Sequence, residues 1–338
     1  MARHIARWDL DKTYLRTEFD TLRDLVRTAL ERPDEKRTNP GAATLLREMV
    51  RAGISVHILS GSPEQMRRRL EDKLRLDGIK WDSFTLKPNL TNMLRLRFRA
   101  LRDQLGYKLP ALLESRARAT PPPPDDPGVR RETLFGDDAE ADAFVYSLYA
   151  DVVAGRVDEP TLAAICDKGR VYEDVAASVL SNAQRLHHED AVERILIHLE
   201  RQTPPDDFRA YGKRAVPFYN YLQAAFVVHE DGRIPAEAVL RVAVELVVQH
   251  RFDGDGLARS YLDLARRGHL RGTGVEPLAE SLDDWSHHDR VPGLVELRRM
   301  VERLPEHAAR AKDTWSDEPA PMPDYLALVG RHNPRHKK

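Results

Sequence analysis

The stretch RWDLDKTYL, residues 7–15, follows a short apolar run and carries polar side chains at alternate positions: Asp9, Asp11 and Thr13. The apolar run itself, HIARW, is a weak strand candidate because Arg7 interrupts it. Open parallel sheets carry their ligand chemistry at the carboxyl ends of their strands. If the other predicted strands also end in polar groups, the chain has the pattern of such a sheet.

Strand and helix patterns alternate from residue 5 to about residue 150. Three further stretches are rich in apolar and β-branched residues and are predicted to be strands: ISVHILS (54–60), WDSFTLK (81–87) and RETLFGDD (131–138). Apolar residues at helical spacing predict helices over 18–32, 39–53, 62–76, 92–106, 108–119 and 140–155. This alternation favours an α/β fold with a mostly parallel sheet wrapped in helices, over residues 1–155.

After Gly155 the strand signals vanish and only the helical period continues. Helices are predicted within 161–186, 189–202, 210–228, 235–251, 256–267 and 293–304. We therefore expect an all-α domain of unknown role over residues 156–310. Its apolar stretches 218–228 and 238–248 are expected to be core helices, with a groove for an acyl chain as the alternative. Residues 311–338 are expected to form a mobile tail, within which YLALVG could dock.

Composition and charge restrict the classes of function. The chain has 338 residues, of which 41% are hydrophobic and 32% charged, and its net charge of -1 gives no overall attraction to nucleic acid or to an anionic membrane. The one cysteine, Cys166, allows no internal disulfide. No stretch approaches the ~20 apolar residues of a membrane span, and the N-terminus lacks a signal-peptide core. We expect a cytoplasmic protein that meets a membrane, if at all, peripherally.

The polar ends of the predicted strands form one constellation. SGSP, residues 60–63, follows the second strand, and Gly136-Asp137-Asp138 ends the last, with Asp142 close behind. If the strands are neighbours, these groups meet at one edge of the sheet. Carboxylates there offer the hard oxygen ligands that suit Mg²⁺.

Such a site suits phosphoryl transfer. One carboxylate could attack phosphorus and form an aspartyl-phosphate, and a second carboxylate two residues on could protonate the leaving oxygen. The Ser60 hydroxyl and nearby backbone N–H groups would hold phosphoryl oxygens. Lys108, between the second and the last motif, would offset the crowding of negative charge.

Several residues have a second interpretation. Lys87, in TLKPN, is the rival candidate for the active-site lysine. Ser62 and Pro63 also fit the N-cap and N1 positions of the following helix. The arginine-rich runs 67–69 and 95–102 could collect an anionic headgroup or polyphosphate, but such runs at helical spacing more often form a solvated face.

The motifs DLDKT, ILSGSP, a lysine and LFGDDAEAD, in this order, resemble the four motifs of the haloacid dehalogenase (HAD) superfamily of phosphatases. Their separations also match, with 51 residues from Asp9 to Ser60, 48 from there to Lys108 and 29 more to Asp137. More narrowly, NPGAATLL, VHILSGSP and GDDAEADAFVY are similar to the catalytic family of the actin-patch-protein-type phosphatidate phosphatases. The resemblance covers residues 5–155 and implies a HAD-type, Rossmann-like parallel sheet with a minimal cap.

The resemblance implies a role for each motif residue. Asp9 would be the nucleophile and Asp11 the general acid and base, with its backbone carbonyl on Mg²⁺. Lys108 would steady the phospho-aspartate. The substrate phosphate would be held by Ser60, Gly61 and Thr13. The metal would be held by Asp9, Asp11, Asp137 and Asp142, the last as a ligand or as a support of the ligands.

Two departures from the family pattern bear on the substrate. Asp138 stands where many members carry Ser, and the Pro-rich insertion before the last strand is long. The short stretch between the first two motifs leaves no room for a large cap, which suits a bulky or surface-presented substrate.

The expected function is therefore Mg²⁺-dependent hydrolysis of a phosphomonoester, with phosphatidate or another phospholipid headgroup as a candidate substrate and no nucleic-acid partner. The alternatives are a phosphatase of soluble phosphometabolites, nucleotides or phosphoproteins, and a degenerate phosphatase domain that serves as a binding or scaffold protein.

Overall fold

The computed structural model describes residues 4–16, 37–87, 101–118, 130–288, 291–316 and 321–332. These residues contain one six-stranded sheet with the order β3-β2-β1-β4-β5-β6, in which every neighbouring pair is parallel. Its strands are β1 (Ile5–Trp8), β2 (Ser55–Pro63), β3 (Ser83–Lys87), β4 (Glu132–Asp137), β5 (Val192–His198) and β6 (Ala215–Phe218). The prediction of an α/β fold with a parallel, Rossmann-like sheet is confirmed.

The strand order reverses between β1 and β4. From β1 the chain proceeds to β2 and β3 on one side, and then returns to the other side of β1 with β4, β5 and β6. In such doubly wound sheets the ligand crevice lies at the carboxyl ends of the two strands that flank the reversal. Asp9 directly follows β1 and Asp137 ends β4, so the topology brings both residues to this crevice.

Each face of the sheet has its own hydrophobic core, because successive side chains of a strand point to opposite faces. On one face, strand residues such as Trp8 and Phe135 pack against helices from both halves of the chain. These helices are α2 (Ala42–Arg51), α3 (Arg67–Leu76), α8 (Tyr221–Glu230), α9 (Ala236–His250), α10 (Gly254–Arg266), α11 (Val275–His288) and α12 (Leu294–Thr314).

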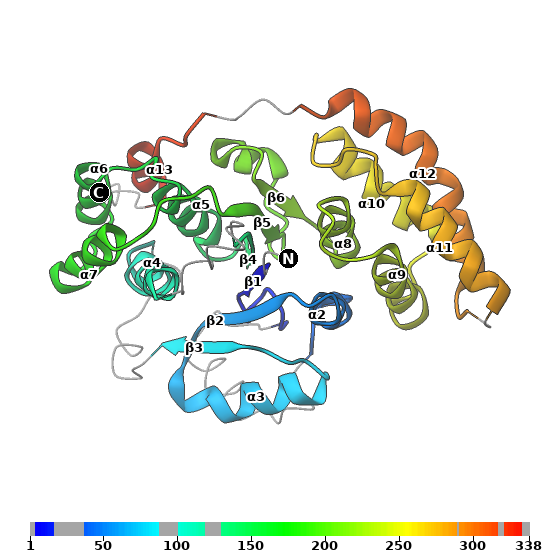
Figure 1. Ribbon diagram of the computed structural model, residues 1–338, viewed down its shortest axis with the longest axis horizontal. Helices are drawn as coiled ribbons and strands as arrows, with labels where there is room; N and C mark the ends of the chain where they lie inside the picture. The colour runs from blue at the N-terminus through cyan, green and yellow to red at the C-terminus, as the bar shows by residue number, and fades with distance from the viewer. Residues whose placement is uncertain are drawn as a thin grey trace, which may run out of the picture.

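The opposite face packs against a second set of helices. Leu134, Ile195 and Ile197 of the sheet contribute to this core. The helices are α4 (Leu101–Ala117), α5 (Asp142–Val153), α6 (Glu159–Lys168), α7 (Glu173–Gln184) and α13 (Tyr325–His332). Figure 1 shows α4 to α7 with α13 at one side of the sheet and α8 to α12 at the other. Two 3-10 helices, η1 (Glu64–Met66) and η3 (Pro205–Tyr211), complete the described elements.

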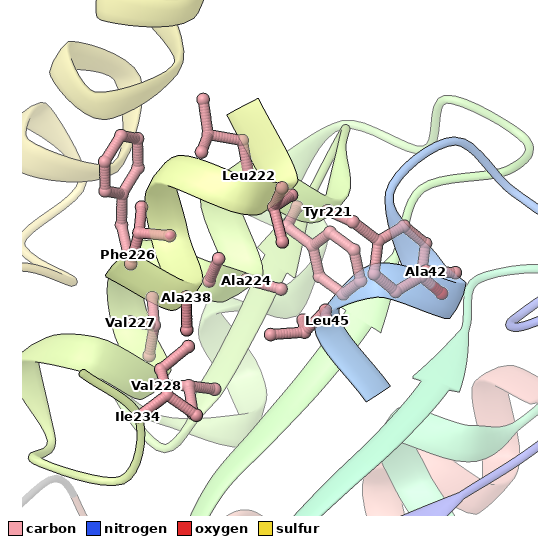
Figure 2. Close-up of a cluster of buried hydrophobic side chains, with 14 of the residues drawn as sticks. Ala42, Leu45, Tyr221, Leu222, Ala224, Phe226, Val227, Val228, Ile234 and Ala238 are labelled. Atoms are coloured by element: carbon pink, nitrogen blue, oxygen red, sulfur yellow. The ribbon is translucent and has the colours of Figure 1, made fainter. Parts of the chain in front are cut away.

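Helix α8 lies inside the first core, as the sequence predicts for the stretch 218–228. All its residues from Tyr221 to Val228 are buried. Figure 2 shows Tyr221 and Ala224 of α8 beside Ala42 and Leu45 of α2. The core interpretation of this stretch is therefore confirmed.

Two strands lie beyond residue 155, where the sequence analysis expected helices alone. β5 occupies part of the segment 189–202, and β6 precedes α8. β5 is covered by helices on both faces, so its run VERILIH does not alternate cleanly between apolar and polar residues. The expectation of an all-α region is wrong in this respect, and the sheet continues across the predicted boundary, although the other elements described there are helices.

Two helices also differ from the predicted ones. The residues 92–106 and 108–119 were expected to form separate helices, but α4 continues across residue 107 and accommodates Pro110. α13 lies within the expected mobile tail and packs on α5 and α6, with Val329 fully buried.

The predicted helix over 18–32 and the Pro-rich insertion lie outside the described residues. Among the residues that are described, no helix has the length and the apolar composition that crossing a bilayer would require.

Candidate active site

Four carboxylates gather at the crevice between β1 and β4. One oxygen atom of each lies within 4.8 Å of the corresponding atoms of the other three. We call this group the acidic cluster: Asp9, Asp137, Glu140 and Asp142. Asp9 is held beside β4 because its backbone N–H donates to the carbonyl of Phe135 at 3.0 Å and so continues the pairing of the two strands.

The turn from β4 into α5 places the other three carboxylates. Asp137 Oδ1 accepts the backbone N–H groups of Ala139 and Glu140 at 2.6 and 2.9 Å. Asp142 Oδ2 accepts the backbone N–H of Asp137 at 3.2 Å, which folds the start of α5 back over the strand end. Gly136 makes this approach possible, since a Cβ atom there would lie 2.5 Å from Asp142 Oδ2.

Lys108, on α4, points into the acidic cluster and is fully buried. Its ammonium nitrogen lies 2.5 Å from Asp142 Oδ1, 3.1 Å from Glu140 Oε2 and 3.3 Å from Asp9 Oδ1. Lys87, the rival from the sequence, ends the edge strand β3. Of these two lysines, Lys108 is the one that the fold brings to the carboxylates.

Burial and mutual repulsion dominate the electrostatics of the acidic cluster. The pKa values of Asp9, Asp137 and Asp142 are all raised, first because burial penalises the charged carboxylate and also because neighbouring carboxylates repel it. Burial alone would lower the pKa of Lys108, but the attraction of Asp142, Asp9 and Glu140 outweighs it and the pKa is raised. The cluster therefore holds more negative charge than Lys108 balances.

The donor set fits a hard divalent cation. Carboxylate oxygens are the ligands that Mg²⁺ and Ca²⁺ take in proteins. Asp9 Oδ1 is buried and accepts no hydrogen bond, although Lys108 lies beside it, so one lone pair at the centre of the cluster has no donor. A cation among these oxygens would satisfy that atom and offset the repulsion. The residues present thus fit a metal ion, and Glu140, which the sequence analysis did not name, belongs to the group.

Asp11 lies outside the acidic cluster, and its carboxylate contacts the carboxyl end of β2. Its Oδ2 accepts hydrogen bonds from the hydroxyls of Ser60 at 2.9 Å and Ser62 at 2.7 Å. Ser60 Oγ in turn accepts the backbone N–H of Ser62 at 3.0 Å. The side chain of Asp11 is therefore not one of the four grouped carboxylates, and the expectation that its backbone carbonyl binds the metal stays a prediction.

The serine pair also corrects a detail of the sequence analysis. Ser62 does not cap a helix: β2 continues to Pro63, and α3 begins at Arg67 without a side-chain cap. The Ser62 hydroxyl instead donates to Asp11, as the Ser60 hydroxyl does. The helix-capping interpretation did not predict this contact.

Three distant side chains fix the turn that carries Asp9 and Asp11. Lys12 adopts the left-handed conformation, with φ 62°. Its carbonyl accepts from Asn39 Nδ2 at 3.0 Å and faces His198 Nδ1 at 3.2 Å. The next carbonyl, of Thr13, accepts from Asn39 at 2.7 Å and from the Tyr221 hydroxyl at 2.5 Å. Strand β5 and helix α8 therefore support the site, so the region after residue 155 is part of its construction.

The remaining predicted residues lie in different places relative to the acidic cluster. The Thr13 hydroxyl donates to Asp9 Oδ2 at 3.2 Å and lies at 3.5 Å from Asp137 Oδ2, so it is part of the acidic edge. Gly61 lies between the two serines, and its predicted contact with phosphate stays a prediction. Asp138 lies outside the acidic cluster, where its carboxylate accepts the backbone N–H groups of Arg201 and Thr203 at 2.8 and 3.0 Å.

The side chains at the centre of the site are shielded from solvent. Asp9, Ser60, Asp137 and Asp142 are each 0% exposed. Two cavities lined by described residues lie elsewhere, one at the amino ends of β4, β5 and β6 and the other between β1 to β3 and α4.

No protein-family model, curated protein or solved structure matches this chain.

Proposed function

We propose that this chain is a Mg²⁺-dependent phosphomonoester hydrolase of the haloacid dehalogenase type, which acts through an aspartyl-phosphate on Asp9. One observation carries the proposal. The acidic cluster and Lys108 meet at the reversal of the strand order, and the Asp11–Ser60–Ser62 group lies on the other side of the same turn. This combination provides a nucleophile, an acid and base, hydroxyl donors and a cation site at one edge.

Asp9 is suited to nucleophilic attack because it directly follows β1 at the crevice and its carboxylate is held in a fixed position. Its Oδ1 has no hydrogen-bond donor, and its Oδ2 is held by Thr13 at 3.2 Å. A carboxylate held in this way would attack phosphorus with one oxygen while the other stays among the oxygens that would bind the cation, and the bond to the leaving oxygen would break as the new bond forms. Lys108, at 3.3 Å, would then stabilise the negative charge of the phosphorylated side chain.

Asp11 is suited to proton transfer. Its carboxyl group already faces two hydroxyl groups, and a phosphate that takes the donors of Ser60 and Ser62 would allow Asp11, in its protonated form, to transfer that proton to the leaving oxygen. After the alcohol departs, the same carboxylate would accept a proton from the water that cleaves the aspartyl-phosphate.

The acidic cluster would hold the metal ion through Asp9, Asp137, Asp142 and Glu140. When bound, Mg²⁺ would polarise the phosphoryl group and neutralise part of its charge. We propose only the chemical class of the substrate, a phosphomonoester. Phosphatidate or another phospholipid is one candidate class, and soluble phosphorylated compounds or phosphoproteins are the other.

The test is hydrolysis of p-nitrophenyl phosphate with and without Mg²⁺. We expect turnover that requires Mg²⁺ and that falls by about 10³-fold or more in Asp9→Asn, because the amide cannot act as the nucleophile. Asp206→Asn is the matched control, since this aspartate is 70% exposed and pairs only with the neighbouring Arg209 among the described residues. Circular dichroism and thermal melting establish that both variants fold.

Two results would contradict the proposal. Turnover by Asp9→Asn at the wild-type rate would exclude Asp9 as nucleophile. Failure of the wild type to hydrolyse any member of a panel that includes phosphatidate in mixed micelles would exclude the hydrolase and favour a binding or scaffold role.

A further inference from the structure

A cavity lies at the amino edge of the sheet, opposite the acidic cluster. Its volume is about 470 Å³, within the range of small-molecule sites. Residues of β5, the loop before β6 and α5 line it, among them Arg194, Arg214 and Asp151. We call it the amino-edge cavity. Along α5, Asp151 lies roughly 14 Å from Asp142, so this cavity is separate from the candidate active site.

Positive charge exceeds negative charge in the lining of the amino-edge cavity. Four acidic and six basic side chains line it, the basic ones being Arg131, Arg156, Arg194, Lys213, Arg214 and Arg271. They come from β5 and from the turns around it, so they approach the cavity from several directions. A ligand that enters this space meets a net positive field.

The buried carboxylates of the lining already have their donors. Asp151 accepts from the Tyr325 hydroxyl at 2.5 Å and from Arg156 and Arg214 at 3.3 and 3.4 Å. Asp231 accepts two hydrogen bonds from Arg194, at 2.7 and 2.9 Å.

Arg156 and Arg214, in contrast, have more N–H donors than their contacts with the described carboxylates use. Arg156 and Arg214 reach Asp151 and Asp190 through two nitrogen atoms each, at 3.1 to 3.4 Å, and a guanidinium group has five N–H donors. The cavity therefore offers donors to a ligand more readily than acceptors.

Ser147 provides an independent indication of a ligand. It lies one turn before Asp151 on α5, lines the cavity and is 3% exposed. Its hydroxyl has no hydrogen-bond partner among the described residues. Buried polar groups without a partner are rare in folded proteins. The hydroxyl oxygen is shielded in this conformation, so the serine side chain would rotate to donate to a molecule in the cavity.

We propose that the amino-edge cavity binds a small phosphorylated molecule, whose phosphoryl group is held by Ser147, Arg156 and Arg214. A phosphoryl group carries oxygens in tetrahedral directions and accepts from donors that converge from different elements, whereas a carboxylate presents two oxygens in one plane. This inference goes beyond the proposed hydrolase and does not depend on it.

The experiment is calorimetric titration of inorganic pyrophosphate into the full chain carrying Asp9→Asn, in EDTA. The Asp9 substitution and the chelator prevent turnover, so binding is measured irrespective of whether the chain is a hydrolase. We expect one binding event, weakened by about tenfold or more in Arg156→Gln and by about threefold or more in Ser147→Ala. Because the Ser147 hydroxyl has no partner, Ser147→Ala should melt at the parent temperature.

The matched controls are Ser178→Ala on α7 and Arg185→Gln at its end, both exposed and outside the lining. They should bind pyrophosphate as the parent does. Absence of binding, equal binding by the cavity variants and the controls, or loss of binding in Ser60→Ala with retention in Ser147→Ala would overturn the proposal. Binding of citrate in preference to pyrophosphate would overturn the assigned ligand class.

Discussion

Two groups of charged side chains are buried in this sheet, and they differ in how their charge is balanced. At the carboxyl edge, four carboxylates surround Lys108. Under α4 and α5, the second group joins Arg7 of β1, Arg116 of α4 and Glu132 of β4; we call it the arginine–glutamate cluster. Both groups link β1, β4 and α4, and both are shielded from solvent.

Every oxygen of Glu132 has two donors. Oε2 accepts from Arg7 Nε at 2.7 Å and from the Tyr149 hydroxyl at 2.9 Å. Oε1 accepts from Arg7 and from Arg116, both at 3.0 Å. Burial alone would raise the pKa of Glu132, but the attraction of Arg7 and Arg116 and these hydrogen bonds outweigh it and lower the pKa to about 2.

The two clusters show how compensating cations change the effect of burial on the pKa of a carboxyl group. Glu132 and Asp137 are equally buried at 0% exposure, yet the pKa of the first is lowered and that of the second is raised. The difference is the supply of positive charge and donors. The arginine–glutamate cluster is a completed structural unit, whereas the acidic cluster gains from one more cation.

The largest expected effect comes from breaking the completed unit. Glu132→Gln leaves Arg7 buried without a carboxylate and Arg116 with Glu189 as its remaining carboxylate partner, and we expect the free energy of unfolding to fall by about 3–5 kcal/mol. Chemical denaturation measures it. Glu64→Gln is the matched control, because Glu64 is 45% exposed in its pair with Arg67 and should change stability little. An unchanged midpoint for Glu132→Gln would contradict the comparison.

The same pair predicts a pH dependence. Because the pKa of Glu132 is about 2 in the folded chain and 4.5 ordinarily, the unfolded chain takes up this proton first as the pH falls. The stabilisation of about 3 kcal/mol is complete above pH 4.5 and is lost as the pH falls towards 2. Denaturation from pH 6 to pH 2.5 of the wild type and Glu132→Gln should show a smaller acid loss in the variant. Parallel curves would contradict the assignment.

Asp137→Asn makes the same chemical change in the acidic cluster, and we expect the opposite sign. In EDTA it removes one repelled carboxylate while an amide oxygen can still accept from Ala139 and Glu140, so stability should rise by about 1 kcal/mol. Chemical denaturation in EDTA measures the change. A loss as large as that of Glu132→Gln would show that the two clusters do not differ in charge balance.

A smaller effect is expected at the support of the catalytic turn. Tyr221→Phe removes the hydrogen bond to the Thr13 carbonyl, which should cost about 1 kcal/mol of stability. If the turn positions Asp9 and Asp11, kcat for p-nitrophenyl phosphate should fall about 3- to 10-fold with KM nearly unchanged. Tyr172→Phe, at a side chain that is 62% exposed, is the control. A stability loss without a change in kcat would restrict Tyr221 to a structural role.

The sequence predicted the residues at strand ends better than the residues that support them. Asp9, Asp137 and Asp142 are recognisable because they lie at the ends of regular elements, and parallel strands bring such ends to one edge. Lys108 lies inside α4 and was indicated by its position between the second and the last motif. Glu140 joins the acidic cluster only because of the turn after β4. Its position three residues after Asp137 could have indicated that it lies in this turn. The contacts of Asn39, His198 and Tyr221 join residues far apart in the chain, and no local pattern encodes them.

The secondary structure was also predicted well where the local pattern decides it and less well where distant contacts decide it. Arg7 weakened the prediction of β1 because its partner Glu132 lies 125 residues away and cannot be inferred locally. β5 was assigned to a helix because a short apolar run inside a fully covered sheet carries no period that separates strand from helix. The weak signal of β1 and the error at β5 both arise where tertiary packing, and not the local pattern, decides the structure.

The most direct measurement is calorimetric titration of Mg²⁺ into metal-free protein. The account predicts one site at the acidic cluster, abolished in Asp137→Asn and retained in Asp138→Asn, whose carboxylate is bonded to the loop at residues 201–203. No Mg²⁺ binding by the wild type, or equal binding by Asp137→Asn, would contradict it.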